Sequence, residues 1–235
     1  MPVADAVLQR LALLHGLPTE ALDTLGKYMS LHTFARRAVV LNRGEEGHGL
    51  GFLLEGRLQG VDFTLDGREV GLYFVAAGDY FGELSVVDDG PAPEFVMALG
   101  RAQVAFLPRE AARGLVLSTP SIAEKVMKRL SARVRSASAQ RTLLSLPNPV
   151  QRLCAQLLVL VREEASRIDN APTHQELAIM INTSRETVTR AFQVLQSQHI
   201  LLRDGTTLVV QRSDALADIA DGKAELTKPK PSEGA

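Results

Sequence analysis

Residues 173–195 read THQELAIMINTSRETVTRAFQVL, and we interpret the rest of the chain outward from this stretch. Thr173 is followed three residues later by Glu176, which is the capping-box pattern that starts a helix. A short polar turn at 182–183 interrupts the pattern, and Ser184 is a favourable N-cap for a second helix. Two helices joined by so short a turn predict a helix-turn-helix.

The second predicted helix has one apolar and one polar face. The apolar face gathers Val188, Ala191, Phe192 and Leu195. The opposite face carries Glu186, Thr189, Arg190 and Gln193, with Arg185 at its edge. A helix that reads DNA needs such an arrangement, because arginine can hold guanine with two hydrogen bonds and glutamate can accept one from cytosine. The alternative is that Arg185, Glu186 and Arg190 are solvated charges with local ion pairs.

Two hairpins are predicted from Asp-Gly pairs between apolar runs. Asp204-Gly205 lies within residues 200–210 and would add a wing to the helix-turn-helix. Asp66-Gly67 fits a type I′ turn and belongs to a series of short strands between Thr33 and Leu107. These strands predict an antiparallel barrel or double-sheet roll, preceded by helices over Val3–Leu14 and Pro18–Met29.

Residues 118–146 predict one long helix. Positions that step by alternating fours and threes (123, 127, 130, 134, 137, 141 and 144) are apolar except for Arg141. This 3.5-residue repeat indicates a seam that a second copy of the helix would cover, although packing on the chain's own barrel is the alternative. Its basic flank comprises Lys125, Lys128, Arg129, Arg133 and Arg135. Pro147-Asn148-Pro149 ends the helix, and a further helix is predicted over Val150–Arg167.

The 235-residue chain has a net charge of −1, but its halves differ in sign. Residues 1–117 hold 10 Lys and Arg against 15 Asp and Glu, a net charge of −5; residues 118–235 hold 16 against 12, a net charge of +4. The asymmetry fits an acidic sensing half and a basic half that faces DNA. The single Cys154 excludes an internal disulfide and any cysteine-built metal site. With no membrane-span pattern and no signal-peptide layout, we expect a cytoplasmic protein.

Residues 5–213 resemble the Crp/Fnr family, because Ser-Arg-Glu-Thr-Val-x-Arg at 184–190 matches the recognition helix of its cyclic-AMP receptor branch. The resemblance implies an α+β fold: an N-terminal β-roll of the cyclic-nucleotide-binding type (a double-stranded antiparallel β-helix, or jelly roll), a long dimerisation helix and a C-terminal winged helix-turn-helix. The expected boundaries are 1–117 for the effector domain, 118–146 for the dimerisation helix, 147–149 for the hinge, 150–220 for the DNA-binding domain and 221–235 for a disordered tail.

The resemblance also implies a transcription regulator, not an enzyme, that binds double-stranded DNA as a homodimer and works with RNA polymerase. By the match, Arg185, Glu186 and Arg190 would read a TGTGA-like half-site, with Thr189 on the same face. The side chains expected near phosphates are Thr173, Gln175 and Ser184. His174 stands where that branch has arginine. A two-fold dimer would bind two half-sites about one helical turn apart.

Gly82, Glu83 and Leu84 resemble the start of the family's phosphate-binding cassette. In cyclic-nucleotide binders that glutamate holds the ribose hydroxyl, and a later arginine and a serine or threonine hold the cyclic phosphate. By position, Pro93 replaces the arginine and Glu94 the hydroxyl residue. Proline offers no side-chain donor and an ionised glutamate repels phosphate, so we expect cyclic AMP not to be the effector.

On the long helix, Ser138 matches a family adenine contact, while Ala137 stands where threonine is usual. The open possibilities are a different nucleotide, a small apolar or acidic effector, or no effector. We expect no resident cofactor and no metal. If Gly82-Glu83-Leu84 binds no effector, it would be an inherited structural turn.

Two other classes of protein remain open. A cupin-type enzyme would share the β-roll, but its metal needs a cluster of histidine and carboxylate ligands, and the strands offer only His48 with Glu45 and Glu46. A cyclic-nucleotide-responsive module acting on a protein partner would leave the winged motif unexplained. Five scattered histidines leave haem binding unsupported.

Overall fold

The computed structural model describes residues 3–46, 49–67, 69–161 and 166–226. The chain forms two compact units, residues 1–135 and 136–235, and each is described by itself. Their boundary falls inside the long helix that the sequence assigns to dimerisation.

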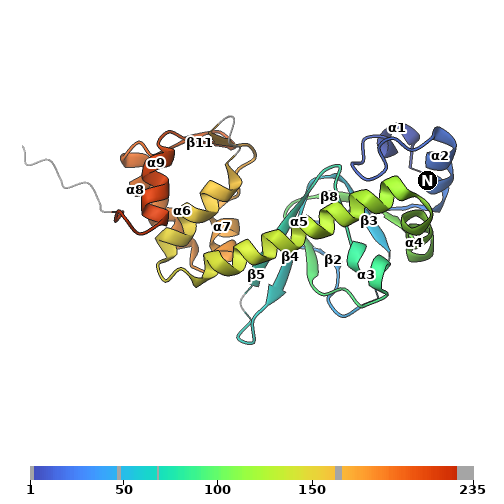
Figure 1. Ribbon diagram of the computed structural model, residues 1–235, viewed down its shortest axis with the longest axis horizontal. Coiled ribbons are helices and arrows are strands. Elements are labelled where there is room, and N and C mark those ends of the chain that lie inside the picture. Colours follow the sequence, from blue (N-terminus) through green and yellow to red (C-terminus); the bar gives the residue numbers. More distant parts are fainter. Residues whose placement is uncertain (1–2, 47–48, 68, 162–165, 227–235) are drawn as a thin grey trace, which may run out of the picture. The chain divides into compact units, whose positions relative to one another are not determined.

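The first unit is a roll of two four-stranded sheets, ordered β1-β8-β3-β6 and β2-β7-β4-β5 (Figure 1). Every pairing in them is antiparallel. The strands are β1 (Ser30–Phe34), β2 (Val39–Leu41), β3 (Leu50–Glu55), β4 (Arg57–Phe63), β5 (Glu69–Ala76), β6 (Tyr80–Phe81), β7 (Phe95–Ala98) and β8 (Ala102–Leu107). The predicted double-sheet roll is confirmed.

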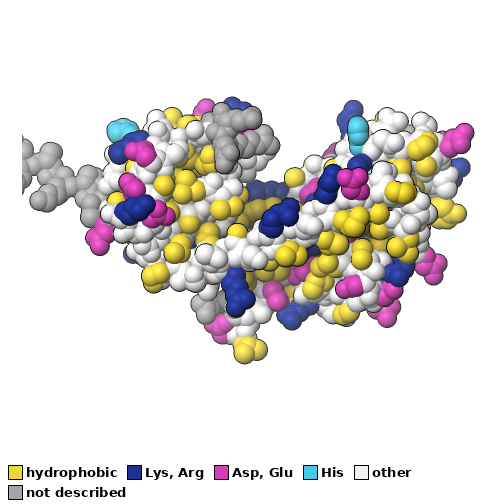
Figure 2. Space-filling view, in the orientation of Figure 1, with side chains coloured by type: hydrophobic (Ala, Val, Ile, Leu, Met, Phe, Trp, Pro, Cys, Tyr) yellow, Lys and Arg dark blue, Asp and Glu magenta, His cyan; other side chains and the backbone are white. Residues whose placement is uncertain are grey.

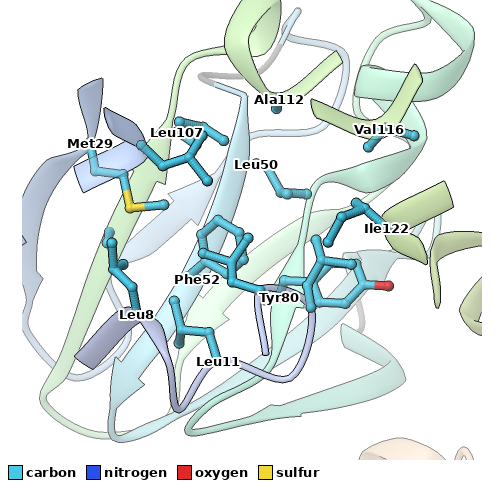
Figure 3. Packing of buried hydrophobic residues seen from close by; sticks show 14 of the residues in the cluster. Leu8, Leu11, Met29, Leu50, Phe52, Tyr80, Leu107, Ala112, Val116 and Ile122 are labelled. Atoms are coloured by element: carbon cyan, nitrogen blue, oxygen red, sulfur yellow. The ribbon is translucent and has the colours of Figure 1, made fainter. Parts of the chain in front are cut away.

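Two apolar clusters hold this unit together, and alternation along β3 supplies both. Leu53 joins a cluster with residues from both sheets, including Leu58, which therefore lies between the sheets. Leu50 and Phe52 point the other way, into a second cluster with the N-terminal segment, α4 and the start of α5 (Figure 3). Because successive strand residues face opposite sides, a sheet covered on both faces needs the nearly continuous apolar run that β3 shows.

The helices of the first unit differ from the prediction at the N-terminus. They are α1 (Asp5–Leu8), α2 (Thr19–Tyr28), α3 (Glu83–Asp88), α4 (Arg109–Ser118) and α5 (Pro120–Ser145), which continues into the second unit. The prediction of a helix through Leu14 is wrong, because the Ala12 amide donates to Gly78 O (2.9 Å) instead of to the preceding turn. The helices predicted over 18–29 and 118–146 are confirmed, with ends shifted by one or two residues.

The predicted hairpin at Asp66-Gly67 forms, but its turn is not type I′. β4 and β5 pair from Phe63 opposite Glu69, so five residues connect them. Gly67 has a φ of 79°, whereas Asp66 has no positive φ. The Gly67 amide donates to Thr64 O, which closes a turn before the glycine reverses the chain.

The second unit holds the end of α5, a bundle of short helices and a three-stranded antiparallel sheet ordered β10-β11-β9. Its elements are α6 (Pro149–Leu160), β9 (Arg167–Ile168), α7 (His174–Met180), α8 (Arg185–Ser197), β10 (Leu201–Asp204), β11 (Thr207–Val210) and α9 (Ser213–Ala220). Asn148 caps α6 by accepting from the Val150 amide (2.8 Å).

The prediction of a helix through Arg167 is wrong at its C-terminal end. α6 ends at Leu160, and Arg167 and Ile168 extend alongside Val209 and Leu208 of β11. Pairing with the hairpin therefore overrides helix propensity in this short segment. The predicted tail lies partly outside the described residues, which stop at 226.

Candidate nucleic-acid interface and effector pocket

The capping box at the start of α7 forms as predicted. The Thr173 amide donates to Glu176 Oε2 (2.7 Å), and the Glu176 amide donates to Thr173 Oγ1 (3.3 Å). Thr173 and Gln175 are exposed, while Leu177 is buried against the rest of the unit. The reciprocal bonds fix where α7 begins and leave its first turn open to solvent.

α8 is anchored by its cap and by its apolar face. The Thr187 amide donates to Ser184 Oγ (3.1 Å), which starts the helix at Arg185. The buried residues of α8 are Val188, Ala191, Phe192 and Leu195. All four belong to the predicted apolar face, and their burial fixes which side of the helix faces outward.

The predicted reading residues lie on the exposed side of α8. Arg185, Glu186 and Arg190 are exposed, and Thr189 is half-buried. Among the residues that the structure describes, the side chains of the first three form no hydrogen bond or ion pair, so the local ion pairs of the alternative interpretation are absent there. Their hydrogen-bonding groups remain available to a partner.

His174 joins the two helices of the motif. Its Nδ1 lies 3.0 Å from Thr189 Oγ1, and its ring packs 4.5 Å from that of Phe192. Thr189 Oγ1 donates its proton to Arg185 O (2.9 Å), so His174 must donate through Nδ1 to complete the pair. Burial, together with nearby Arg203 and Arg185, lowers the pKa of His174, which keeps the ring neutral at pH 7.

The wing forms from β10 and β11. Asp204 pairs with Thr207, so Gly205 and Thr206 make the turn, and Gly205 has a φ of 56°. Arg203 is exposed on β10, and its Nε donates to Gly205 O (3.3 Å).

Arg152 of α6 is a positioning residue that our sequence reasoning missed. Its guanidinium donates to Ile181 O (2.8 Å) and Asn182 O (3.3 Å), at the end of α7, and to Leu146 O (2.7 Å), at the end of α5. These carbonyls have no intrahelical donor, so one side chain satisfies two helix ends and holds the turn of the motif. The φ of 50° at Asn182 marks that turn. No sequence motif around Arg152 predicts these distant partners.

The predicted effector pocket begins at the start of α3. Gly82 has a φ of 83°, and a Cβ there would lie 2.8 Å from Gly49 O, so the position suits only glycine. Glu83 follows and is 1% exposed, while Leu84 is half-buried. Pro93 is exposed, whereas Glu94 is 7% exposed. Of the predicted set, the structure brings Glu83 and Glu94 together around one cation.

That cation is Arg133 of α5. Its Nη1 donates to Glu83 Oε1 (2.6 Å) and its Nη2 donates to Glu94 Oε1 (2.8 Å). Tyr73 Oη also donates to Glu94 Oε1 (2.6 Å), and the guanidinium carbon lies 4.1 Å from the centre of the Tyr73 ring. We call Tyr73, Glu83, Glu94 and Arg133 the Arg133 cluster.

Two members of the Arg133 cluster, Tyr73 and Arg133, have raised pKa values. Burial, followed by the neighbouring Glu94, raises the pKa of Tyr73 far above its ordinary value, so the phenol remains a donor. Burial disfavours the charged guanidinium, but Tyr73, Glu83 and Glu94 outweigh it and raise the pKa of Arg133. A buried charge is tolerated when it is paired in this way.

Tyr73 was not identified from the sequence. The sequence feature that could have identified Tyr73 is Gly60, which pairs with Tyr73 between β4 and β5. A Cβ at Gly60 would lie 2.4 Å from the Tyr73 ring, so the glycine makes the space that the ring fills. One turn before Arg133, Arg129 makes a similar link between α5 and the roll. It donates to Asp79 Oδ1 (2.5 Å) and to Tyr80 O (2.8 Å).

Ser138 is exposed on α5 and belongs to the second unit. His48, named for the cupin alternative, lies outside the described residues. Within those residues there is no group of three histidine, cysteine or carboxylate side chains able to hold a metal ion. No helix in the described part of the chain is both long and apolar enough to cross a membrane.

Comparisons with known proteins agree with both halves of the chain. Residues 31–119 match the family model of the cyclic nucleotide-binding domain, and residues 151–219 match that of the Crp-like helix-turn-helix domain. The chain is 28% identical over 212 residues to the cyclic AMP receptor protein of Thermus thermophilus, covering 90% of this chain and 98% of that protein.

It is also 27% identical over 219 residues to the CRP-like cAMP-activated global transcriptional regulator of Mycobacterium tuberculosis, covering 91% of this chain and 98% of that protein. Among solved structures, FixK2 from Bradyrhizobium japonicum shares the fold, with a TM-score of 0.68 at 19% identity over 81% of this chain and 96% of that one. The two sequence relatives are regulators rather than enzymes. The chain belongs to the Crp/Fnr family of transcription regulators.

Proposed function

We propose that this protein binds, as a homodimer, a palindromic operator with TGTGA-like half-sites. The observation that carries the proposal is that Arg185, Glu186 and Arg190 are exposed and have no partner among the described residues, on a helix whose other face is buried. An arginine in the major groove can hold guanine O6 and N7, and a glutamate can accept from the cytosine amino group. Thr173 and Gln175 on the capped first turn of α7, and Ser184 before α8, are exposed and would contact phosphates.

The homodimer is supported by the free face of α5. Met127, Val134 and Leu144 of the predicted seam are 60%, 68% and 36% exposed. Ile122 and Val126 pack on the chain's own roll, and the seam position Leu130 is partly buried against the same cluster. The two interpretations of the helix therefore each account for part of its apolar surface. Figure 2 shows hydrophobic side chains beside α5 in the first unit, with basic and acidic side chains among them. Sedimentation should give a dimer, and a Val134→Glu variant should shift toward monomer while Lys128→Ala does not.

We propose that cyclic AMP is not the signal. The two relatives are named for that ligand, but this chain has exposed Pro93 and buried Glu94 where the family has an arginine and a hydroxyl residue. Neither residue can donate to a cyclic phosphate. We place the protein in the cytoplasm, where it would act together with RNA polymerase on promoter DNA.

The test is a titration of labelled duplexes followed by fluorescence anisotropy, at several salt concentrations. A palindrome of TGTGA-like half-sites should bind far more tightly than a duplex with scrambled half-sites. Arg185→Ala should reduce that preference, while Arg212→Ala, which removes an exposed arginine at the start of α9, should not. Equal affinity for both duplexes would reject sequence-specific binding.

A further inference from the structure

The Arg133 cluster occupies the part of the roll that the resemblance assigns to an effector. Its two carboxylates are buried, Glu83 being 1% and Glu94 7% exposed, and both bind the same guanidinium. The face of Tyr73 covers that guanidinium at 4.1 Å. Carboxylates that accept from the N–H groups and an aromatic ring over the group are the features by which proteins recognise a guanidinium.

The charges exclude an anion from this place. An anionic ligand would have to draw Arg133 away from both carboxylates. Glu94 would lose its cation, and Glu83 would keep only Arg129, whose Nε lies 3.9 Å from Glu83 Oε1, which is unfavourable for two buried carboxylates. Glu83 Oε2 is also buried and has no hydrogen-bond partner among the described residues. A buried carboxylate oxygen that lacks a donor favours a further N–H or O–H group beside it and disfavours a phosphate.

We propose that the pocket is a guanidinium site occupied by the chain's own Arg133, which joins the roll to α5 without a small-molecule effector. This inference rests on the proposed function only in those experiments that measure DNA binding. Arg133 links three elements of the roll to one point on α5: β5 through Tyr73, α3 through Glu83 and the segment before β7 through Glu94. In a protein controlled by a small molecule, the ligand would make that link.

The direct test removes the guanidinium and supplies it from solution. Arg133→Ala in the full chain deletes two methylenes and the guanidinium, and millimolar ethylguanidinium replaces the deleted atoms. Loss of a partner from a buried ion pair should lower the Tm by roughly 5–10 °C, and ethylguanidinium should restore most of the loss. Lys128→Ala, which removes an exposed lysine from the same helix, should leave the Tm unchanged with or without the additive.

Specificity of the rescue is checked with matched additives. Tetramethylammonium has the same charge but no N–H donors, and it should not rescue Arg133→Ala. Cyclic AMP should not rescue it either. If ethylguanidinium stabilises Arg133→Ala no more than it stabilises Lys128→Ala, the site does not recognise a guanidinium and the proposal is overturned.

The wild-type protein gives an independent measurement should Arg133→Ala fail to fold. Native mass spectrometry first establishes that the purified chain carries no ligand. Calorimetry with cyclic AMP and cyclic GMP should then show no saturable binding, and operator affinity should be the same with and without them. Saturable nucleotide binding, or operator binding only after nucleotide is added, would overturn the proposal.

Failure of the two proposals can be told apart. If Arg133→Ala is rescued by ethylguanidinium in Tm while no duplex is bound, the pocket inference stands and the operator assignment fails. If the wild-type chain binds its operator only with a nucleotide, the operator assignment stands and the pocket inference fails.

Discussion

The outer face of α8 and the Arg133 cluster use the same residue types, arginine and glutamate, in opposite ways. On α8 the charged groups are exposed and have no partner within the described chain. In the cluster Glu83 and Glu94 are buried, and the half-buried Arg133 binds them at 2.6 and 2.8 Å. An exposed charge contributes little to folding and remains available for binding, whereas a buried one must be paired. Mutations should therefore affect binding in the first region and stability in the second.

The largest expected effect comes from the support beneath α8. Phe192 is 2% exposed and touches the His174 ring, so Phe192→Ala leaves a cavity and should cost about 3–5 kcal/mol of stability. Urea unfolding checks this, with the exposed neighbour substitution Gln193→Ala as the control. A loss no larger than the control's would mean that the apolar face does not anchor the helix.

Arg152→Ala should come next. The substitution removes a charged donor from the carbonyls that end α7 and α5, and bonds of this kind contribute about 1.5–3 kcal/mol each. Because Arg152 is half-buried and water can replace part of these bonds, we expect about 2 kcal/mol of lost stability in urea unfolding. DNA binding should also weaken, to the same extent for every sequence. Arg152→Lys keeps the charge but cannot span both helix ends, so it should recover only part of either loss.

Arg185→Ala tests the exposed region. Its effect should be about 1–3 kcal/mol of discrimination at one base pair, with unfolding unchanged within about 0.5 kcal/mol. Anisotropy titrations over all four bases at each half-site position measure the discrimination. A uniform loss across sequences would identify Arg185 as a phosphate contact instead.

Tyr73→Phe tests the buried region with a single hydrogen bond. The change keeps the ring over Arg133 but removes the donor to Glu94, and should cost about 1 kcal/mol of stability. DNA specificity should not change, because Tyr73 belongs to the first unit and not to the outer face of α8. Unfolding curves of the two proteins, compared at one pH between 6 and 8, decide the matter, since the raised pKa of Tyr73 keeps the phenol protonated there.

The smallest effect is expected at His174. Since its pKa lies below the ordinary 6.5, the ring adds no charge at pH 7. His174→Arg adds a cation at the first turn of α7 and should steepen the slope of log affinity against log salt by about 0.9, if that turn meets a phosphate. An unchanged slope would place residue 174 away from the DNA backbone.

Much of the architecture was predictable because it depends on local pattern. Thr173, Ser184 and the spacing of Val188, Phe192 and Leu195 defined the helix-turn-helix, since caps and apolar periodicity act within one or two turns. The strand series predicted the roll for the same reason. The errors lie at Leu14 and Arg167, where a bond to Gly78 and pairing with β11 override local helix propensity.

The Arg133 cluster was predictable only in part. Pro93 and Glu94 indicated from the sequence alone that a cyclic phosphate loses its partners, because a missing donor can be recognised residue by residue. The sequence could not reveal which side chains contact the two buried glutamates. Arg133 lies 39 residues from Glu94 and 50 from Glu83, and Tyr73 lies 21 residues from Glu94.

The sequence by itself determined the two domain types, the face of α8 that points outward and the absence of an arginine and a hydroxyl residue at positions 93 and 94. Each follows from side chains close together along the chain. Only the tertiary structure decided that Arg152 holds the turn of the motif and that Arg133 pairs with Glu83 and Glu94. Packing brings these distant groups together, and burial then requires every charge among them to find a partner.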